Sequence, residues 1–182
     1  MTTRQLPFSS PGERLREAIL ASLALALVLI PCGRAGAQEA DAAAVLAIAD
    51  LALERISAED FVGFTDLMVE EVTLFSVDST ASPTYRARSR TEQRAMSAEV
   101  DIVERGFDPE VRVAGPVATV WYPYDIYVAG EWSHCGVDVF NLVQTASGWR
   151  IVTMIWTVEQ PPACAPHPDG PPPSGEQSRP GR

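Results

Sequence analysis

The chain has 182 residues and a formal net charge of −10, with 24 acidic side chains against 14 basic ones. This length allows one globular domain once the two ends are set aside. Because a strongly acidic domain repels phosphates and anionic headgroups, we expect neither nucleic acid nor a membrane surface as a partner. All basic residues apart from histidine are arginines, which excludes a Schiff-base lysine as catalyst.

The N-terminus has the pattern of a secretory signal peptide. Three arginines precede an apolar run over residues 18–30, Pro31 ends that run, and Ala35-Gly36-Ala37 fits a cleavage site. We therefore expect residues 1–37 to be removed and the mature protein to be secreted or periplasmic. Their loss takes away four arginines and two glutamates and changes the net charge from −10 to −12. The alternative is a membrane anchor, for which the run is short.

Three helices are predicted in the first half of the domain. Apolar residues recur at helical spacing over residues 41–56, which indicates an amphipathic helix. The sequence Ser57-Ala-Glu-Asp60 is typical of a capping box and predicts a second helix, with Phe61 and Phe64 on its inner face as core or pocket wall. A similar pattern begins at Ser89 and predicts a third helix that runs to Val103 and stops at Gly106.

The strands are predicted mainly in the second half. Residues 71–77 form a first strand, residues 78–87 a connection or an irregular edge strand, and residues 110–114 a short strand. Three long runs rich in β-branched and aromatic residues follow, at 117–128, 131–144 and 149–158. Helices on one face of a curved antiparallel sheet make an α+β fold, a cone-shaped half-barrel with three helices on its concave side. We expect this domain to span residues 38–159.

The residues after the domain differ in composition. Residues 160–182 are rich in proline, glycine and polar side chains, and we expect disorder past Cys164. Cys135 and Cys164 are the cysteines left after cleavage at Ala37. In an exported chain they suggest a disulfide, which would stabilise the fold by roughly 3–4 kcal/mol. The alternative is two unpaired thiols.

The helix order and the block over residues 134–158 resemble the nuclear transport factor 2-like superfamily, in its SnoaL-like branch. The resemblance covers roughly residues 40–158 and is sharpest from Phe140-Asn-Leu-Val to Gly148-Trp-Arg-Ile151. It implies a cystatin-like cone around an apolar pocket, often a homodimer through the outer face of the sheet. The family contains ketosteroid isomerase, scytalone dehydratase and polyketide cyclases, and also binding modules without activity, so the fold does not select a function.

The register of the long strands predicts which side chains share a face. If Ala129-Gly130 is a two-residue turn, His134 lies opposite Asp125, and the two side chains point the same way. A bulge would reverse the faces. The predicted pocket face carries Trp121, Asp125, Tyr127, Trp132, His134, Asp138, Phe140, Ile151, Thr153, Ile155 and Thr157.

This face mixes apolar walls with polar groups, as a small-molecule site does. His134 could act as a general acid or base oriented by Asp125, with Asp138 as a second acid. A structural His–Asp pair is the alternative. The expected pocket lining is Trp121, Tyr127, Phe140, Ile151, Ile155, Phe61 and Phe64.

Three functions remain open from the sequence. The first is an exported module that binds a small apolar molecule, as a homodimer and without a cofactor. The second is an isomerase, dehydratase or cyclase acting on an apolar carbonyl compound. The third is a structural dimer whose cone is filled by its own side chains. A metal site is not expected, because the ordered mature domain has a single histidine.

Overall fold

The computed structural model describes residues 33–79, 82–97 and 100–173. The chain divides into two compact units, residues 1–37 and 38–182, and all the strands belong to the second. Most of the predicted signal peptide lies in residues 1–32, outside the described residues. Within the described ranges, no helix is both long and apolar enough to cross a membrane.

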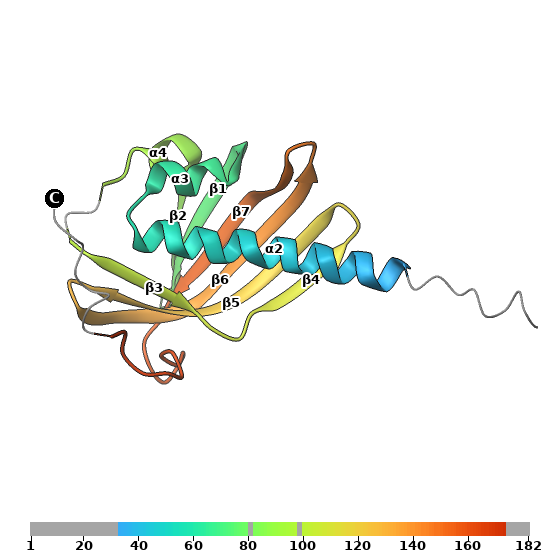
Figure 1. Ribbon diagram of the computed structural model, residues 1–182. Coiled ribbons are helices and arrows are strands. Elements are labelled where there is room, and N and C mark those ends of the chain that lie inside the picture. Colours follow the sequence, from blue (N-terminus) through green and yellow to red (C-terminus); the bar gives the residue numbers. More distant parts are fainter. Residues whose placement is uncertain (1–32, 80–81, 98–99, 174–182) are drawn as a thin grey trace, which may run out of the picture. The chain divides into compact units, whose positions relative to one another are not determined.

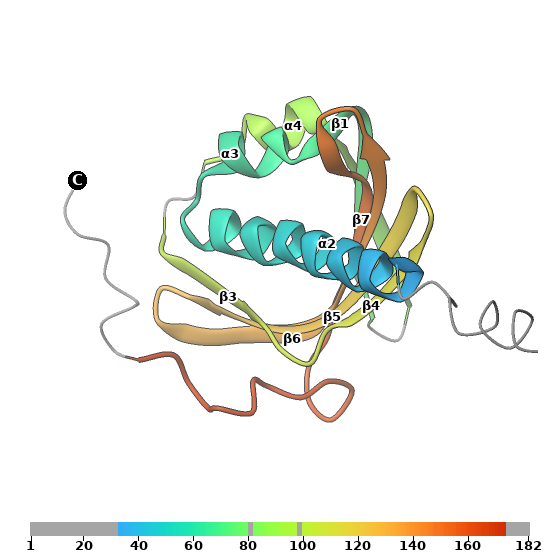
Figure 2. The same cartoon turned by 45° about the vertical axis from the view of Figure 1, so that its right-hand side comes forward.

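The longest helix packs on the concave face of the sheet. Helix α2 (Gly33–Ser57) crosses this face in Figures 1 and 2. Val45, Ala49 and Ala52 are fully buried on it, and the small alanines let the helix backbone approach the strands closely. The helix begins earlier and ends about where the periodicity of residues 41–56 predicts.

The predicted capping box at Ser57 is wrong. Ser57 is the last residue of α2, and its hydroxyl bonds to the backbone of Glu104, donating to the carbonyl at 3.1 Å and accepting from the amide at 2.9 Å. The second helix, α3 (Phe61–Asp66), is instead capped by Asp60, which accepts a hydrogen bond from the Gly63 amide. Ser57 therefore fastens α2 to a strand rather than starting a helix.

Seven strands form one curved sheet in the described part of the chain, in the order β2-β1-β7-β6-β5-β3, with β4 also paired to β5. Their bounds are β1 (Met68–Asp78), β2 (Thr84–Ser89), β3 (Ile102–Gly106), β4 (Glu110–Ala114), β5 (Val117–Val128), β6 (Glu131–Thr145) and β7 (Gly148–Val158). Figure 2 shows the sheet curving around α2. The α+β half-barrel is confirmed, but the sheet is mixed, because β1 and β7 run parallel.

The predicted third helix is correct only at its start. Ser89 and Glu92 form the expected capping box, but α4 (Arg90–Arg94) is a single short turn. Residues 102–106 form β3, which pairs with β5. This pairing gives hydrogen-bond partners to backbone N–H and C=O groups of both strands. This tertiary pairing, and the β-branched residues of the segment, override the helical spacing. Gly106 stops no helix; a side chain there would collide with the ring of Tyr122.

Two β-bulges decide which side chains face inward. The turn at Ala129-Gly130 is as predicted, and Tyr127 pairs with Trp132. Ser133 is then an extra residue, so His134 lies opposite Ile126 and Asp125 opposite Cys135. The predicted pairing of His134 with Asp125 is therefore wrong.

The second bulge lies in β7. Ile151 pairs with Leu142, Val152 is the extra residue, and Asn141 pairs with Thr153. Beyond this point the even-numbered residues of β7 share a face with the even-numbered residues of β6. Met154 is consequently buried inside, while Ile155 is 36% exposed on the convex face.

The segment after β7 returns along the convex face of the hairpin formed by β5 and β6. The predicted disulfide between Cys135 and Cys164 is present, with 5.8 Å between the two Cα atoms. The His167 amide donates to Asp125 at 2.9 Å, and the His167 ring meets the edge of Phe107. Residues 165–173 belong to the segment that we expect to be disordered, and His167 within them is held against the sheet; residues 174–182 lie outside the described residues.

Candidate functional site

An apolar cavity lies between the helices and the concave face of the sheet, with a volume of about 170 Å³. Its lining comes from all three described helices and from six strands, all but β4. The lining residues are Ile56, Phe61, Phe64, Leu74, Arg88, Gln93, Met96, Ile102, Glu104, Tyr124, Ile126, His134, Met154 and Trp156. A mostly apolar wall with few polar groups is the usual composition of a small-molecule site.

Two carboxyls meet beside this cavity. Glu104 points inward from β3 and lines the cavity, and Asp138 of β6 is fully buried beside it. Burial raises the pKa of Glu104 to about 7. Burial, the charge of Glu104 and a hydrogen bond with Glu104 raise the pKa of Asp138 well above its ordinary value.

The oxygens of Asp138 show why a proton must be shared. Both oxygens are buried, and neither accepts a hydrogen bond from an N–H or hydroxyl group of the described residues. A bond between the two carboxyls requires a proton on one of them. The raised pKa values of both carboxyls mean that the pair binds protons at a pH where exposed carboxyls have released them.

His134 and Tyr124 complete this side of the cavity. His134 Nδ1 lies 3.0 Å from the Ser133 hydroxyl. The rings of His134 and Tyr124 meet edge to face, with 5.9 Å between their centroids. Burial lowers the pKa of His134, so the imidazole is neutral at pH 7. The Tyr124 hydroxyl donates to the Thr157 carbonyl at 2.6 Å, and burial raises its pKa. Nε2 of His134 forms no hydrogen bond with described residues and is available to a ligand.

A cationic group lines the cavity from the opposite edge of the sheet. Arg88 on β2 lies over Trp156, with 5.3 Å from the guanidinium carbon to the ring centroid. Its Nη1 donates to Gln93 Oε1 at 3.0 Å and contacts Met96 Sδ at 2.9 Å. Met96 is 41% exposed, so the cavity wall reaches solvent beside Arg88.

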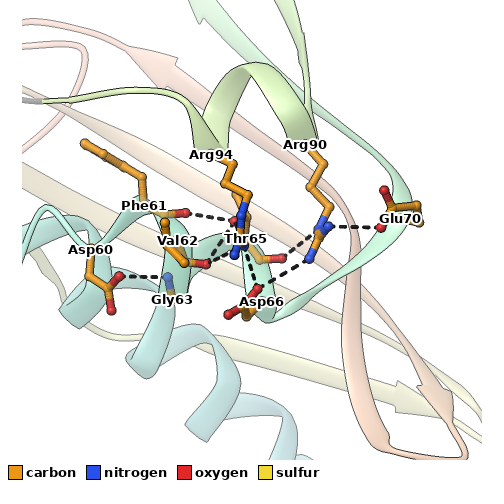
Figure 3. Close-up of polar contacts among 9 residues, drawn as sticks. All are labelled: Asp60, Phe61, Val62, Gly63, Thr65, Asp66, Glu70, Arg90 and Arg94. Carbon is orange, nitrogen blue, oxygen red and sulfur yellow. Dashed lines mark hydrogen bonds and ion pairs between the residues drawn. The ribbon is translucent and has the colours of Figure 1, made fainter.

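Two arginines of α4 hold the helical cover of the cavity together (Figure 3). Arg94 Nη1 donates to the Val62 carbonyl, to Thr65 Oγ1 and, at 2.6 Å, to Asp66. Arg90 Nε donates to the Thr65 carbonyl at 2.9 Å. These donors satisfy carbonyls at the C-terminal end of α3 that the short helix leaves open. They position Phe61 and Phe64, on the same helix, against the cavity.

The structure distributes the predicted site residues over both faces of the sheet. Phe61, Phe64 and His134 line the cavity, and Asp138 lies behind Glu104. Phe140 and Ile151 are fully buried in the core beside it. The remaining predicted members, Trp121, Asp125, Tyr127 and Ile155, lie on the convex face, because the bulges at Ser133 and Val152 shift the register.

Asp125 has a structural role on that convex face. Arg105 donates to both of its oxygens, through Nε at 3.0 Å and Nη2 at 2.8 Å, and the His167 amide binds it as well. The carboxylate is completely buried, and the bidentate ion pair offsets the free-energy cost of removing it from water. Asp125 therefore cannot orient His134, which points to the other side of the sheet.

Sequence reasoning missed three polar cavity residues. Glu104 fell near the end of the predicted helix, and the run Ile102-Val-Glu-Arg-Gly106 lacks the alternation that would mark it as a strand. Arg88 lies between the connection expected over residues 78–87 and the helix expected from Ser89, and Gln93 lies in that helix. No local signal places them at a cavity, because long-range strand pairing brings them there.

Comparison with solved structures identifies the fold. A protein of unknown function from Mycobacterium tuberculosis superposes with a TM-score of 0.58 at 16% identity, over 72% of this chain and 79% of that one. A nuclear transport factor 2-like protein with a cystatin-like fold from Novosphingobium aromaticivorans gives a TM-score of 0.55 at 14% identity, over 71% and 91%. The chain has the nuclear transport factor 2-like fold.

A presumed dehydratase of the nuclear transport factor 2-like family from Streptomyces avermitilis also shares this fold, with a TM-score of 0.54 at 17% identity over 66% of this chain and 96% of that one. No protein-family model matches the sequence, and no curated protein matches it. Identities this low establish the fold and leave activity to be argued from the site.

Proposed function

We propose that the protein binds a small, largely apolar molecule in the cavity between its helices and its sheet. The observation that carries this proposal is the composition of the cavity wall, where aliphatic and aromatic side chains surround a few polar groups. A volume of about 170 Å³ suits a ligand with one ring, since an engineered protein cavity of roughly 150 Å³ holds benzene.

We further propose an acid–base reaction on such a ligand as a second candidate function. The specific observation is the carboxyl pair of Glu104 and Asp138, which holds a proton near pH 7 beside a neutral His134. A base and an acid with pKa values near the working pH suit proton transfer next to a carbonyl. This is the chemistry of an isomerase, dehydratase or cyclase. It replaces the His134–Asp125 pair, which the register separates.

We also propose that the mature protein is exported. The disulfide between Cys135 and Cys164 supports this, because such bonds persist in oxidising compartments. The charge and apolar pattern of residues 1–37 is the second support. Intact mass of the protein from its native host tests it: loss of residues 1–37 is expected, and a retained N-terminus contradicts it.

Binding is tested with toluene as an apolar probe. We expect toluene to raise the midpoint of thermal unfolding, because a ligand at a hundredfold excess over its Kd adds about 2.7 kcal/mol to stability. The variant Ile102→Trp places bulk in the cavity and should remove the effect. Ile155→Trp adds the same bulk on the convex face and should retain it. The same response in both variants, or none in the native protein, would refute the proposal.

The second candidate is tested without knowledge of the substrate. Cyclopentanone in D2O exchanges its α-hydrogens when a base removes a proton and an acid polarises the carbonyl. We expect the protein to accelerate this exchange, followed by NMR, and Glu104→Gln to abolish it. Glu131→Gln, on the exposed end of β6, is the matched control and should exchange as the native protein does. If Glu104→Gln and the native protein exchange the ketone hydrogens at equal rates, the acid–base proposal is refuted and only the binding function stands.

A further inference from the structure

We infer that the ligand of this cavity is a small monocarboxylate, whose carboxylate is bound by Arg88 and Gln93 and whose apolar body fills the cavity. The inference rests on the proposed binding function and specifies the ligand class. Arg88 and Gln93 both line the cavity, and Gln93 is only 5% exposed.

One edge of the Arg88 guanidinium, formed by Nε and Nη2, has no hydrogen-bond acceptor among the described residues. Its hydrogen bonds with described residues come from Nη1, to Gln93 Oε1 and Met96 Sδ. Nε and Nη2 form none there. These two N–H groups are one of the parallel pairs with which a guanidinium binds a carboxylate through two hydrogen bonds. The contact with Trp156 fixes the plane of the guanidinium and so prepares this edge.

Gln93 adds a second donor at the same place. Its Oε1 accepts from Arg88, which leaves its amide nitrogen, Nε2, as a donor at the cavity wall. A carboxylate between Nε2 of Gln93 and the free edge of Arg88 would meet donors only. An amide or an alcohol would also present hydrogens and would lose part of these bonds.

Arg88 lines the cavity with its positive charge unpaired by the described residues. Arg90 and Arg94 pair with Asp66, and Arg105 pairs with Asp125. Arg88 forms no salt bridge with the described residues; Glu92, whose charge it influences, is held by the Ser89 amide and hydroxyl. An arginine that lines an apolar cavity and forms no salt bridge with the described residues is placed to bind the carboxylate of a ligand.

The opposite side of the cavity fixes the orientation. Glu104 and Asp138 come from β3 and β6 and are already acidic, so an anion beside them would be repelled. Arg88 comes from β2, at the other edge of the strand order. The carboxylate therefore stays with Arg88 near solvent, and the apolar body points toward Glu104 and His134.

The test compares three probes of similar size: phenylacetate, phenylacetamide and toluene. Calorimetric titration at pH 7.5 and low salt should show phenylacetate binding at least about tenfold more tightly than phenylacetamide, as expected for a charge-assisted pair. Arg88→Gln should remove this preference and retain toluene binding, and Arg88→Lys should keep part of it. Arg86→Gln is the matched control, because Arg86 lies two residues away on β2, exposed and outside the cavity lining.

The three probes distinguish failure of the monocarboxylate inference from failure of the proposed binding function. Toluene binding without a preference for phenylacetate, or a preference that survives Arg88→Gln, overturns the inference and leaves the binding function standing. Failure of all three probes overturns both. If Arg88→Gln does not fold, salt dependence of the native protein decides: phenylacetate affinity should fall with added salt while toluene affinity does not, and equal behaviour overturns the inference.

Discussion

Two carboxyls that share a proton dominate the chemistry at the scale of single residues. Burial raises the pKa of Glu104 to about 7, from an ordinary value of 4.5, and Asp138 shifts in the same direction. Between pH 4.5 and about 7, Glu104 therefore binds a proton in the folded protein that it has released in the unfolded chain. Stability from this source is complete below the unfolded pKa and is lost as pH rises through the folded one.

We therefore expect the free energy of unfolding to fall between pH 5 and pH 8, by on the order of 1–3 kcal/mol. Glu104→Gln keeps the shape of the side chain and should make this slope shallower, since the amide cannot ionise. Urea unfolding at several pH values measures it. Glu131→Gln, an exposed carboxyl on the same sheet, should leave the slope unchanged. A native slope equal to that of Glu104→Gln would show that the carboxyls are not protonated on folding.

At the scale of elements, the hairpin of β5 and β6 separates two environments. Even-numbered residues of β6 such as His134 and Asp138 face the concave side, whereas Cys135 faces the convex side and carries the tail. Both faces of this hairpin are thus covered, one by α2 and one by residues 159–173. The cavity and the disulfide lie on opposite sides of the same strand and should respond to mutation independently.

Cys164→Ser should lower the free energy of unfolding by about 3 kcal/mol, because the loop closed by the disulfide spans 29 residues. Toluene affinity should not change, since Cys135 points away from the cavity. Chemical unfolding without reductant measures the first effect and calorimetry the second. Ala165→Ser, an exposed neighbour in the tail, is the control. A large loss of toluene binding would contradict the separation of the two faces.

At the scale of the whole molecule, local sequence patterns predict some structural features and not others. The three long strands, the turn at Ala129-Gly130 and the capping box at Ser89 were predictable, because β-branched runs, turn residues and caps act over a few neighbours. The disulfide was predictable from chemistry, because Cys135 and Cys164 are the two cysteines that follow the predicted signal peptide. Phe61 and Phe64 were expected as core or pocket wall, and they line the cavity.

The cavity as a whole could not be predicted from such patterns. Single extra residues at Ser133 and Val152 invert the faces of long strands, and no propensity marks where a bulge falls. Glu104 reaches Asp138 only because β3 pairs with β5, and Arg88 reaches the cavity only because β2 pairs with β1.

The sequence by itself determined the fold class, the long strands and the cysteine pair, because these depend on side-chain type and short spacing. Tertiary structure alone decided that His134 faces Glu104 and Asp138 rather than Asp125, and that Arg88 stands across the cavity from them. The physical reason is that strand register and sheet order are set by long-range backbone hydrogen bonds and by packing against α2, which depend on the whole chain at once.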